Sequence, residues 1–172
     1  PSSSDVTMAG PTIYVIDDQE SVRQALGEML SVFGFSVETF ESADKFLTIA
    51  DQANGCVVAD VMMPGTDGIE LVRELQRRGG RLPIVLISGH ADVPMAVTAI
   101  KAGAGDFIEK PVDDVQLVAA INRAIARSSE QEDMRKLHGD LEERIARLTA
   151  RELEIFDMVV QGFTSHAVAD KL

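Results

Sequence analysis

The strongest constraint on this chain is a short apolar run that ends in a single aspartate. Residues 56–59 are Cys-Val-Val-Ala, Asp60 follows them, and Pro64 with Gly65 comes a few positions later. A short apolar run bounded by turn residues is typical of a buried strand. We therefore predict that Asp60 lies at the carboxyl end of a strand, at the edge of a sheet.

The same arrangement occurs three more times, with a polar side chain directly after an apolar run. These places are residues 13–16 before Asp17 and Asp18, residues 84–87 before Ser88, and residues 107–108 before Glu109 and Lys110. Open parallel sheets bind their ligands beyond the carboxyl ends of the strands. We expect carboxylates, a hydroxyl and an amine to meet there.

Amphipathic segments separate the apolar runs, which favours strands that alternate with helices. The predicted strands are 12–16, 35–39, the run that ends at Asp60, 84–87 and a short strand near 107–108. The predicted helices are 20–33, a helix capped by Ser42, a helix from Ile69 that ends near Gly79, 93–102, and a long helix from about Asp113. Parallel neighbours need crossovers, and these helices supply them. The prediction is an α/β domain over residues 12–127, with a doubly wound five-stranded parallel sheet.

Composition excludes several classes of protein. The net charge of −12 opposes binding of this chain to nucleic acid, and no apolar stretch approaches the roughly 20 residues of a membrane span. The three histidines lack zinc-ligand spacing, and the one cysteine, Cys56, lies inside an apolar run. Residues 1–11 are predicted to be a flexible tail without a signal peptide. These features fit a cytoplasmic protein.

The composition changes after residue 127. Residues 128–148 are charged and favour a helix, with an apolar stripe of Met134, Leu137, Leu141, Ile145 and Leu148. This segment is either a solvated linker helix, which we favour, or a dimerising coiled coil. Thr149 and Glu152 match a capping box before another helix, Gly162 is a plausible stop, and Thr164 can cap a short helix over 165–172. Residues 149–172 therefore resemble the opening of an all-α domain.

The predicted cluster of Asp17, Asp18 and Asp60 requires a cation, because like charges at close range repel. Oxygen ligands without histidine or cysteine favour Mg²⁺. Lys110 and Ser88 could then neutralise and bind a phosphoryl group carried by Asp60. Each residue also has an ordinary alternative: a helix start for the aspartate pair, a helix cap for Ser88, and an exposed loop for Lys110. It is improbable that all of these ordinary alternatives hold at once for polar residues that each follow a strand.

These motifs resemble the two-component response regulators, and within them the FixJ-like subgroup with a LuxR-type helix-turn-helix output domain. The resemblance rests on Asp17-Asp18, on Asp60 with 63–65 (Met-Pro-Gly), on 88–90 (Ser-Gly-His) and on 107–111 (Phe-Ile-Glu-Lys-Pro), and 91–97 (Ala-Asp-Val-Pro-Met-Ala-Val) supports the subgroup. It covers residues 12–127, and a weaker similarity to a LuxR-type unit covers 148–172. It implies a flavodoxin-like receiver and only the N-terminal part of a DNA-binding domain at 149–172.

The resemblance also implies roles for individual residues. Asp60 would accept a phosphoryl group from a sensor histidine kinase. Asp17, Asp18, Asp60 and the backbone carbonyl of Met62 would hold Mg²⁺. Ser88 and Lys110 would contact the phosphoryl group, and Ser88 with Phe107 would form the switch. The side chain of Met62 cannot orient an attacking water, and Phe107 lacks the hydroxyl of a switching tyrosine, so the lifetime of the phosphorylated state is open.

The expected protein is thus a phosphorylation-controlled transcription regulator and not an enzyme. It would dimerise when phosphorylated, and it would bind DNA through a complete output domain but not through this fragment, which lacks a recognition helix. Three alternatives stay open at this point. They are a Mg²⁺-dependent phosphatase with Asp60 as nucleophile, a receiver that only binds proteins, and a flavin or nucleotide binder. The acidic, glycine-free residues 17–20 disfavour the last of these.

Overall fold

The structure, a computed structural model, describes residues 11–90 and 92–160. The chain divides into two compact units, one that ends at Ser129 and one that begins at Glu130. The predicted tail lies outside the described residues except for Pro11.

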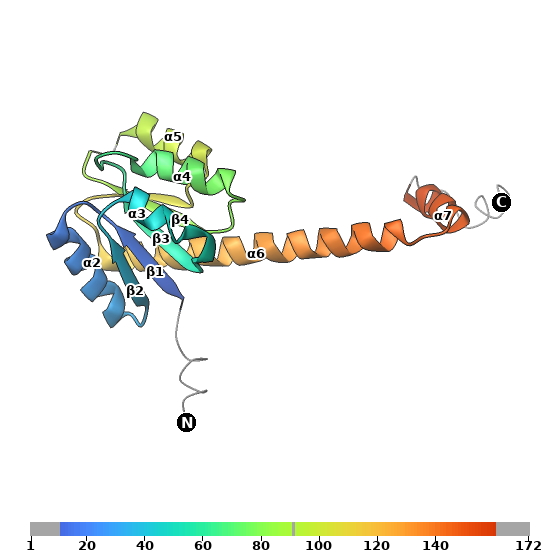
Figure 1. Ribbon diagram of the computed structural model, residues 1–172, viewed down its shortest axis with the longest axis horizontal. Coiled ribbons are helices and arrows are strands. Elements are labelled where there is room, and N and C mark those ends of the chain that lie inside the picture. Colours follow the sequence, from blue (N-terminus) through green and yellow to red (C-terminus); the bar gives the residue numbers. More distant parts are fainter. Residues whose placement is uncertain (1–10, 91, 161–172) are drawn as a thin grey trace, which may run out of the picture. The chain divides into compact units, whose positions relative to one another are not determined.

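The first unit contains a five-stranded sheet in which every neighbouring pair is parallel. The strands are β1 (Thr12–Ile16), β2 (Ser36–Phe40), β3 (Gly55–Asp60), β4 (Ile84–Ser88) and β5 (Asp106–Glu109). Their order in the sheet is β2-β1-β3-β4-β5 (Figure 1). The predicted doubly wound parallel sheet is therefore confirmed.

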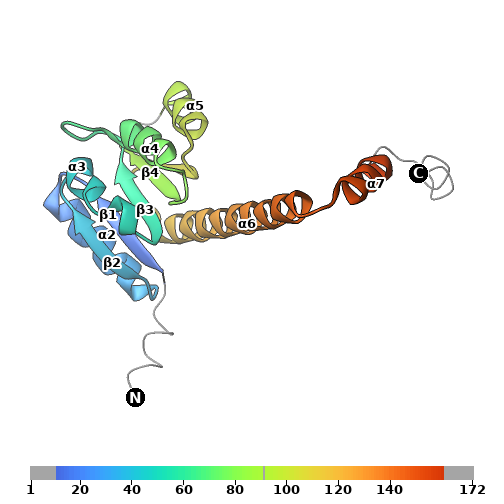
Figure 2. The ribbon, with the colours of Figure 1, turned by 45° about the vertical axis from the view of Figure 1, so that its right-hand side comes forward.

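Helices cover both faces of this sheet, as Figures 1 and 2 show. They are α2 (Glu20–Val32), α3 (Ala43–Leu47), α4 (Gly68–Arg77), α5 (Val93–Ala102) and α6 (Asp114–Ala146). Leu30 of α2 and Ile121 of α6 are buried in one apolar cluster, while Phe46 of α3, Leu71 of α4 and Ala99 of α5 are buried in the other. Because both faces are covered, the central strands are apolar on both sides between their ends.

Local side-chain hydrogen bonds fix where several helices begin. The hydroxyl of Ser42 accepts a hydrogen bond from the backbone N–H of Lys45 at 3.1 Å, as the sequence predicted. Asp67 caps α4 and Asp92 caps α5 in the same way. Such caps satisfy N–H groups that have no partner inside the helix. They set where each loop at the sheet edge ends.

The structure changes several predicted bounds by about one residue and adds one element. β2 is displaced by one residue from 35–39, because the backbone N–H of Phe35 bonds to the carbonyl of Leu30 and closes the end of α2 instead. The helix predicted over 20–33 ends at Val32. A short 3-10 helix, η1 (Ala50–Gln52), was not predicted, since three residues carry no periodic signal.

The second unit contains the end of α6 and a further helix, α7 (Ala150–Val160). The predicted capping box is confirmed: the Thr149 hydroxyl accepts from the N–H of Glu152 at 3.2 Å, and the Glu152 carboxylate accepts from the N–H of Thr149 at 2.9 Å. Gly162, Thr164 and the helix predicted over 165–172 lie outside the described residues. The predicted segments 12–127, 128–148 and 149–172 remain predictions. Among the described helices, none is both long enough and apolar enough to cross a membrane.

Candidate functional site

The strand order brings the predicted polar residues to one end of the sheet. From β1 the chain proceeds outward to β2, whereas from β3 it proceeds in the opposite direction through β4 to β5. Ligands of such sheets bind where the direction reverses, here between β1 and β3. Asp17 follows β1 and Asp60 ends β3, so both lie at this point.

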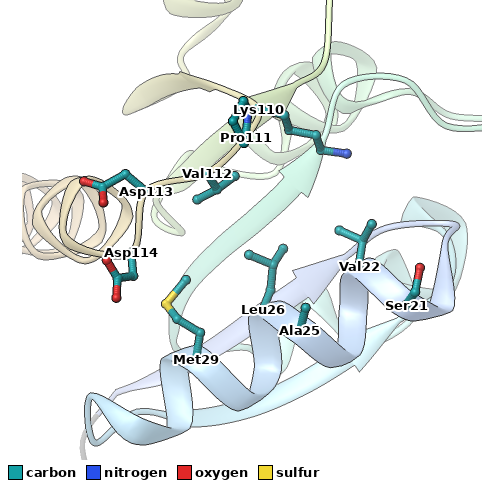
Figure 3. Close-up of a pocket in the computed structure, with 10 residues that line it drawn as sticks. All are labelled: Ser21, Val22, Ala25, Leu26, Met29, Lys110, Pro111, Val112, Asp113 and Asp114. Atoms are coloured by element: carbon teal, nitrogen blue, oxygen red, sulfur yellow. The ribbon is translucent and has the colours of Figure 1, made fainter.

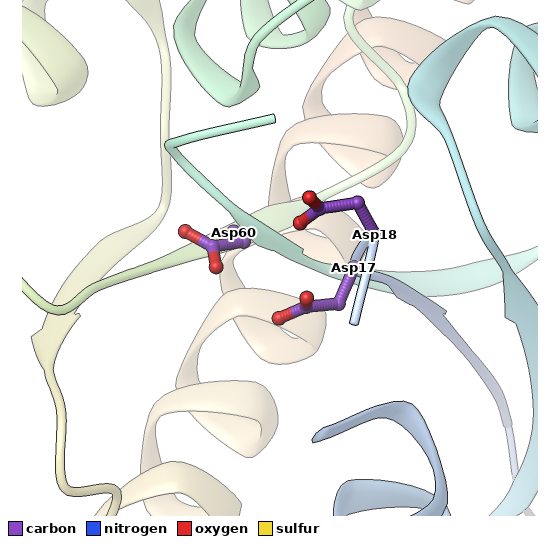
Figure 4. A group of neighbouring side chains, drawn as sticks. All are labelled: Asp17, Asp18 and Asp60. Carbon is purple, nitrogen blue, oxygen red and sulfur yellow. The ribbon is translucent and has the colours of Figure 1, made fainter. Parts of the chain in front are cut away.

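The three predicted carboxylates form one cluster (Figure 4). Each of Asp17, Asp18 and Asp60 offers an oxygen, and these oxygens lie within 4.8 Å of one another. Asp17 and Asp60 are buried, with 2% and 7% of their surface exposed, and Asp18 is exposed. Oxygen-only donors open to solvent on one side suit Mg²⁺, which keeps part of its hydration shell. The residues present therefore fit the expected ion.

Lys110 reaches into this cluster from the residue after β5. Its ammonium nitrogen lies 2.7 Å from Asp60 Oδ2 and 3.6 Å from Asp17 Oδ2. Burial by itself lowers the pKa of Lys110, but the hydrogen bond and charge of Asp60, together with the charge of Asp17, outweigh burial and raise that pKa. Lys110 is therefore a charged partner of both carboxylates, and its alternative as a free loop residue is excluded.

The surroundings of Asp17 raise the pKa of its carboxyl group. Burial raises its pKa, and the nearby charge of Asp60 adds to this, while a backbone hydrogen bond from Gln19 and the charge of Lys110 oppose it. The Gln19 N–H donates to Asp17 Oδ1 at 2.8 Å. The guanidinium of Arg23 also donates to the backbone carbonyl of Asp17 at 2.6 Å. Sequence reasoning missed Arg23, although its place in the first turns of α2, six residues after Asp17, was a usable signal.

Asp60 is oriented by the loop that follows it. Its Oδ1 accepts a hydrogen bond from the backbone N–H of Met62 at 3.0 Å, which leaves Oδ2 to Lys110. The side chain of Met62 is more than half exposed, so it encloses no part of the site. The proposed ligand role of the Met62 carbonyl stays a prediction.

Ser88 ends β4, the strand next to the one that ends at Asp60, and Phe107 lies on β5. Ser88 is fully buried, and its carbonyl accepts a hydrogen bond from the backbone N–H of Lys110 at 2.8 Å. This bond ties the end of β4 to the residue that carries the ammonium group. Phe107 is half-buried against the cluster that contains Leu86 and Ala99. The switch assigned to Ser88 and Phe107 stays a prediction.

A groove opens beside Lys110, between α2 and the segment that follows β5 (Figure 3). Its volume is about 490 Å³, and it is lined by Ser21, Val22, Ala25, Leu26, Met29, Lys110, Pro111, Val112, Asp113 and Asp114. Apolar side chains of α2 and Val112 face each other across it, and two aspartates stand at one end. Sequence reasoning did not find this groove, because its two walls are nearly 90 residues apart.

Comparison with known proteins identifies this arrangement. The response regulator receiver domain family matches residues 13–122. The chain belongs to this family. The chain is 39% identical over 158 residues to the transcriptional regulatory protein FixJ of Azorhizobium caulinodans, a match that covers 91% of this chain and 75% of that protein.

Solved structures give the same result. The crystal structure of FixJ-N superposes with a TM-score of 0.65 at 46% identity and covers 69% of this chain and 96% of that one. The low-resolution structure of the response regulator StyR gives a TM-score of 0.75 at 38% identity, with coverage of 95% and 83%. The chain is therefore a FixJ-like response regulator of the two-component type with a flavodoxin-like receiver, as the sequence predicted.

Proposed function

We propose that Asp60 is the phosphoacceptor of this receiver and that a sensor histidine kinase supplies the phosphoryl group. The observation that carries the proposal is the position of Asp60: it is buried between Asp17 and Lys110, and its Oδ2 lies 2.7 Å from the ammonium of Lys110. A carboxylate held beside a fixed cation and two further carboxylates is suited to phosphoryl transfer, which depends mainly on positioning and charge neutralisation.

The transfer can be written with all atoms in place. A carboxylate oxygen of Asp60 forms a bond to phosphorus while the phosphorus–nitrogen bond of the donor phosphohistidine breaks; the electron pair of that bond stays on the imidazole nitrogen, which takes a proton from water. Asp17, Asp18, Asp60 and the Met62 carbonyl would hold Mg²⁺, which would supply positive charge for the phosphoryl oxygens. Lys110 neutralises part of the negative charge of the phosphoryl group, and the Ser88 hydroxyl donates a hydrogen bond to one of its oxygens.

The groove between α2 and residues 110–114 supports a protein as the donor. It lies directly beside Lys110, and its apolar lining includes the half-buried Val22 and Met29 together with the buried Leu26. A small phosphodonor needs no such surface, whereas a kinase domain must dock before its phosphohistidine can reach Asp60. We assign the groove to the kinase domain that carries the phosphohistidine.

The output of the phosphorylated receiver is proposed to be dimerisation and, through a complete LuxR-type domain, control of transcription. α5 supports the first part, since it exposes Val93, Val97 and Ile100 at helical spacing beside β5. The capping box of Thr149 and Glu152 supports the second, because it starts α7 as the resemblance implies. This role is that of a regulator in the cytoplasm rather than an enzyme.

Dimerisation is tested by sedimentation of the chain with Mg²⁺, in the presence and absence of beryllofluoride as a phosphoryl mimic. The molecular mass should rise when the mimic is bound. A constant mass with Asp60 occupied would contradict this output while leaving the phosphoacceptor assignment intact.

The phosphoacceptor is tested with a small phosphodonor and Mg²⁺, followed by intact-mass analysis. The wild-type chain should gain one phosphoryl group, and Asp60→Asn, which keeps the shape but removes the nucleophile, should gain none. Asp133→Asn makes the same change at an exposed position of α6 and should label like wild type. Equal labelling of wild type and Asp60→Asn would overturn the assignment.

A further inference from the structure

The hydroxyl of Ser88 is already engaged on both its donor and its acceptor side. Its oxygen accepts a hydrogen bond from the backbone N–H of His90 at 3.1 Å. The same oxygen lies 3.7 Å from the sulfur of Met95, to which it donates its proton. Ser88 is fully buried, so water does not offer an alternative acceptor.

Met95 is held in place by the first turn of α5. Its backbone N–H donates to Asp92 Oδ1 at 2.7 Å, which caps the helix. Its side chain is half-buried and packs against the apolar cluster that also takes in Phe107. The thioether therefore connects the end of β4 to the start of α5.

A serine hydroxyl carries one proton, so Ser88 cannot donate to Met95 and to a phosphoryl oxygen at the same time. The thioether is a weak acceptor, whereas an anionic phosphoryl oxygen is a strong one. We propose that Met95 is the resting partner of the Ser88 proton and that this contact sets how readily the receiver switches. The inference rests on the proposed function, because the competitor is a phosphoryl group on Asp60.

This contact makes Met95 a positioning residue with two effects. While Ser88 donates to the sulfur, its one proton is directed toward the first turn of α5 and is not available to a phosphoryl oxygen on Asp60. When the phosphoryl group takes the proton, the first turn of α5 loses its link to β4. The same helix presents Val93, Val97 and Ile100 to solvent. Loss of the Ser88–Met95 contact therefore affects the helix that carries the surface proposed for dimerisation.

The inference predicts opposite effects from two substitutions at one position. Met95→Leu keeps an apolar side chain of similar size but leaves the resting hydroxyl without an acceptor, so it destabilises the resting state. Met95→Gln supplies a stronger acceptor and stabilises that state. With Mg²⁺ present, affinity for beryllofluoride should rise about threefold in Met95→Leu and fall about threefold in Met95→Gln.

Titration calorimetry on the 172-residue chain measures these affinities, with thermal melts to establish that each variant is folded. Ser88→Ala removes the hydroxyl proton for which Met95 and the phosphoryl group compete. In the Ser88→Ala background, Met95→Leu should therefore have no effect on the affinity for beryllofluoride. A simple loss of packing would instead lower affinity in both variants and would persist without the hydroxyl. That result would overturn the inference.

Wild-type protein gives a further readout that needs no variant at position 95. With ¹³C-labelled methionine methyl groups, the Met95 signal should shift when beryllofluoride binds, and in Ser88→Ala this shift should be lost. If wild type fails to bind beryllofluoride, the proposed function is wrong. If it binds, and the Met95 signal and both affinities stay unchanged, the role of Met95 alone is refuted.

Discussion

Replacing Lys110 with methionine should strengthen Mg²⁺ binding while weakening the binding of a phosphoryl mimic. In the structure the ammonium of Lys110 lies 2.7 Å from Asp60 Oδ2 and 3.6 Å from Asp17 Oδ2, and both oxygens belong to the proposed ion site. The ammonium therefore competes with the ion for the same carboxylates. Methionine keeps an unbranched apolar side chain but removes this competing charge.

The size of the effect follows from Coulomb's law. An ion about 2.1 Å from Asp60 Oδ2 would lie within roughly 5 Å of the ammonium. The Lys110 side chain is 26% exposed, so solvent screens its charge, and the dielectric constant of water gives the lower limit of the effect. The repulsion between the ammonium and a divalent ion is then about 1.7 kcal/mol, and its removal should tighten Mg²⁺ binding roughly tenfold.

Calorimetric titration with Mg²⁺ at low ionic strength, above neutral pH, measures this change. Lys101→Met removes the same charge from an exposed position on α5 and should leave the affinity nearly unchanged, because charges distant from the site are screened. Beryllofluoride should bind Lys110→Met more weakly, since the phosphoryl contact is lost. If Mg²⁺ affinity stays constant or falls in Lys110→Met, the ammonium does not compete for the carboxylates and the electrostatic argument is wrong.

Three further predictions concern pH, packing and the kinase. The pKa of Asp17 is raised above 3.8, so the metal-free chain should lose stability as pH rises through that pKa, and Mg²⁺ affinity should fall as pH drops through it. Thermal melts and Mg²⁺ titrations across pH measure the two trends, and Asp17→Asn should remove the part of each pH dependence that comes from Asp17. Gly68→Ala places a Cβ 2.7 Å from a backbone oxygen of β3 and should cost about 1–3 kcal/mol in thermal melts, whereas Gly139→Ala, with nothing within 4 Å, should not destabilise the chain. Ala25→Arg fills the groove and should slow phosphoryl transfer from a kinase about tenfold but leave labelling by a small donor unchanged; Gln24→Arg, on the same helix outside the groove lining, is its control.

Much of the fold could be predicted because its signals are local. An apolar run followed by Asp60 or by Ser88 identifies a strand and its end within a few residues. Ser42 and Thr149 begin helices through hydrogen bonds to residues three positions away, and the structure contains both bonds. The parallel order then follows, because strands separated by helices have few other ways to pair.

The bounds of elements were less predictable, because they depend on partners elsewhere in the chain. Phe35 is apolar and was assigned to the second strand, yet its N–H bonds to Leu30 and closes α2. The register of β2 is set by its pairing with β1, where Thr12 lies opposite Ser36. Neither fact has a signal within the segment itself.

The sequence by itself determined which groups of the site carry charge or a hydroxyl and at which strand ends they lie. The tertiary structure decided how those groups are used, because a hydrogen bond depends on distances that no spacing along the chain records. It placed the Lys110 ammonium beside two carboxylates, and it made the sulfur of Met95 the hydrogen-bond acceptor of the Ser88 hydroxyl. It also joined α2 to the residues after β5 in one groove, since two segments so far apart in sequence meet only when the sheet has formed.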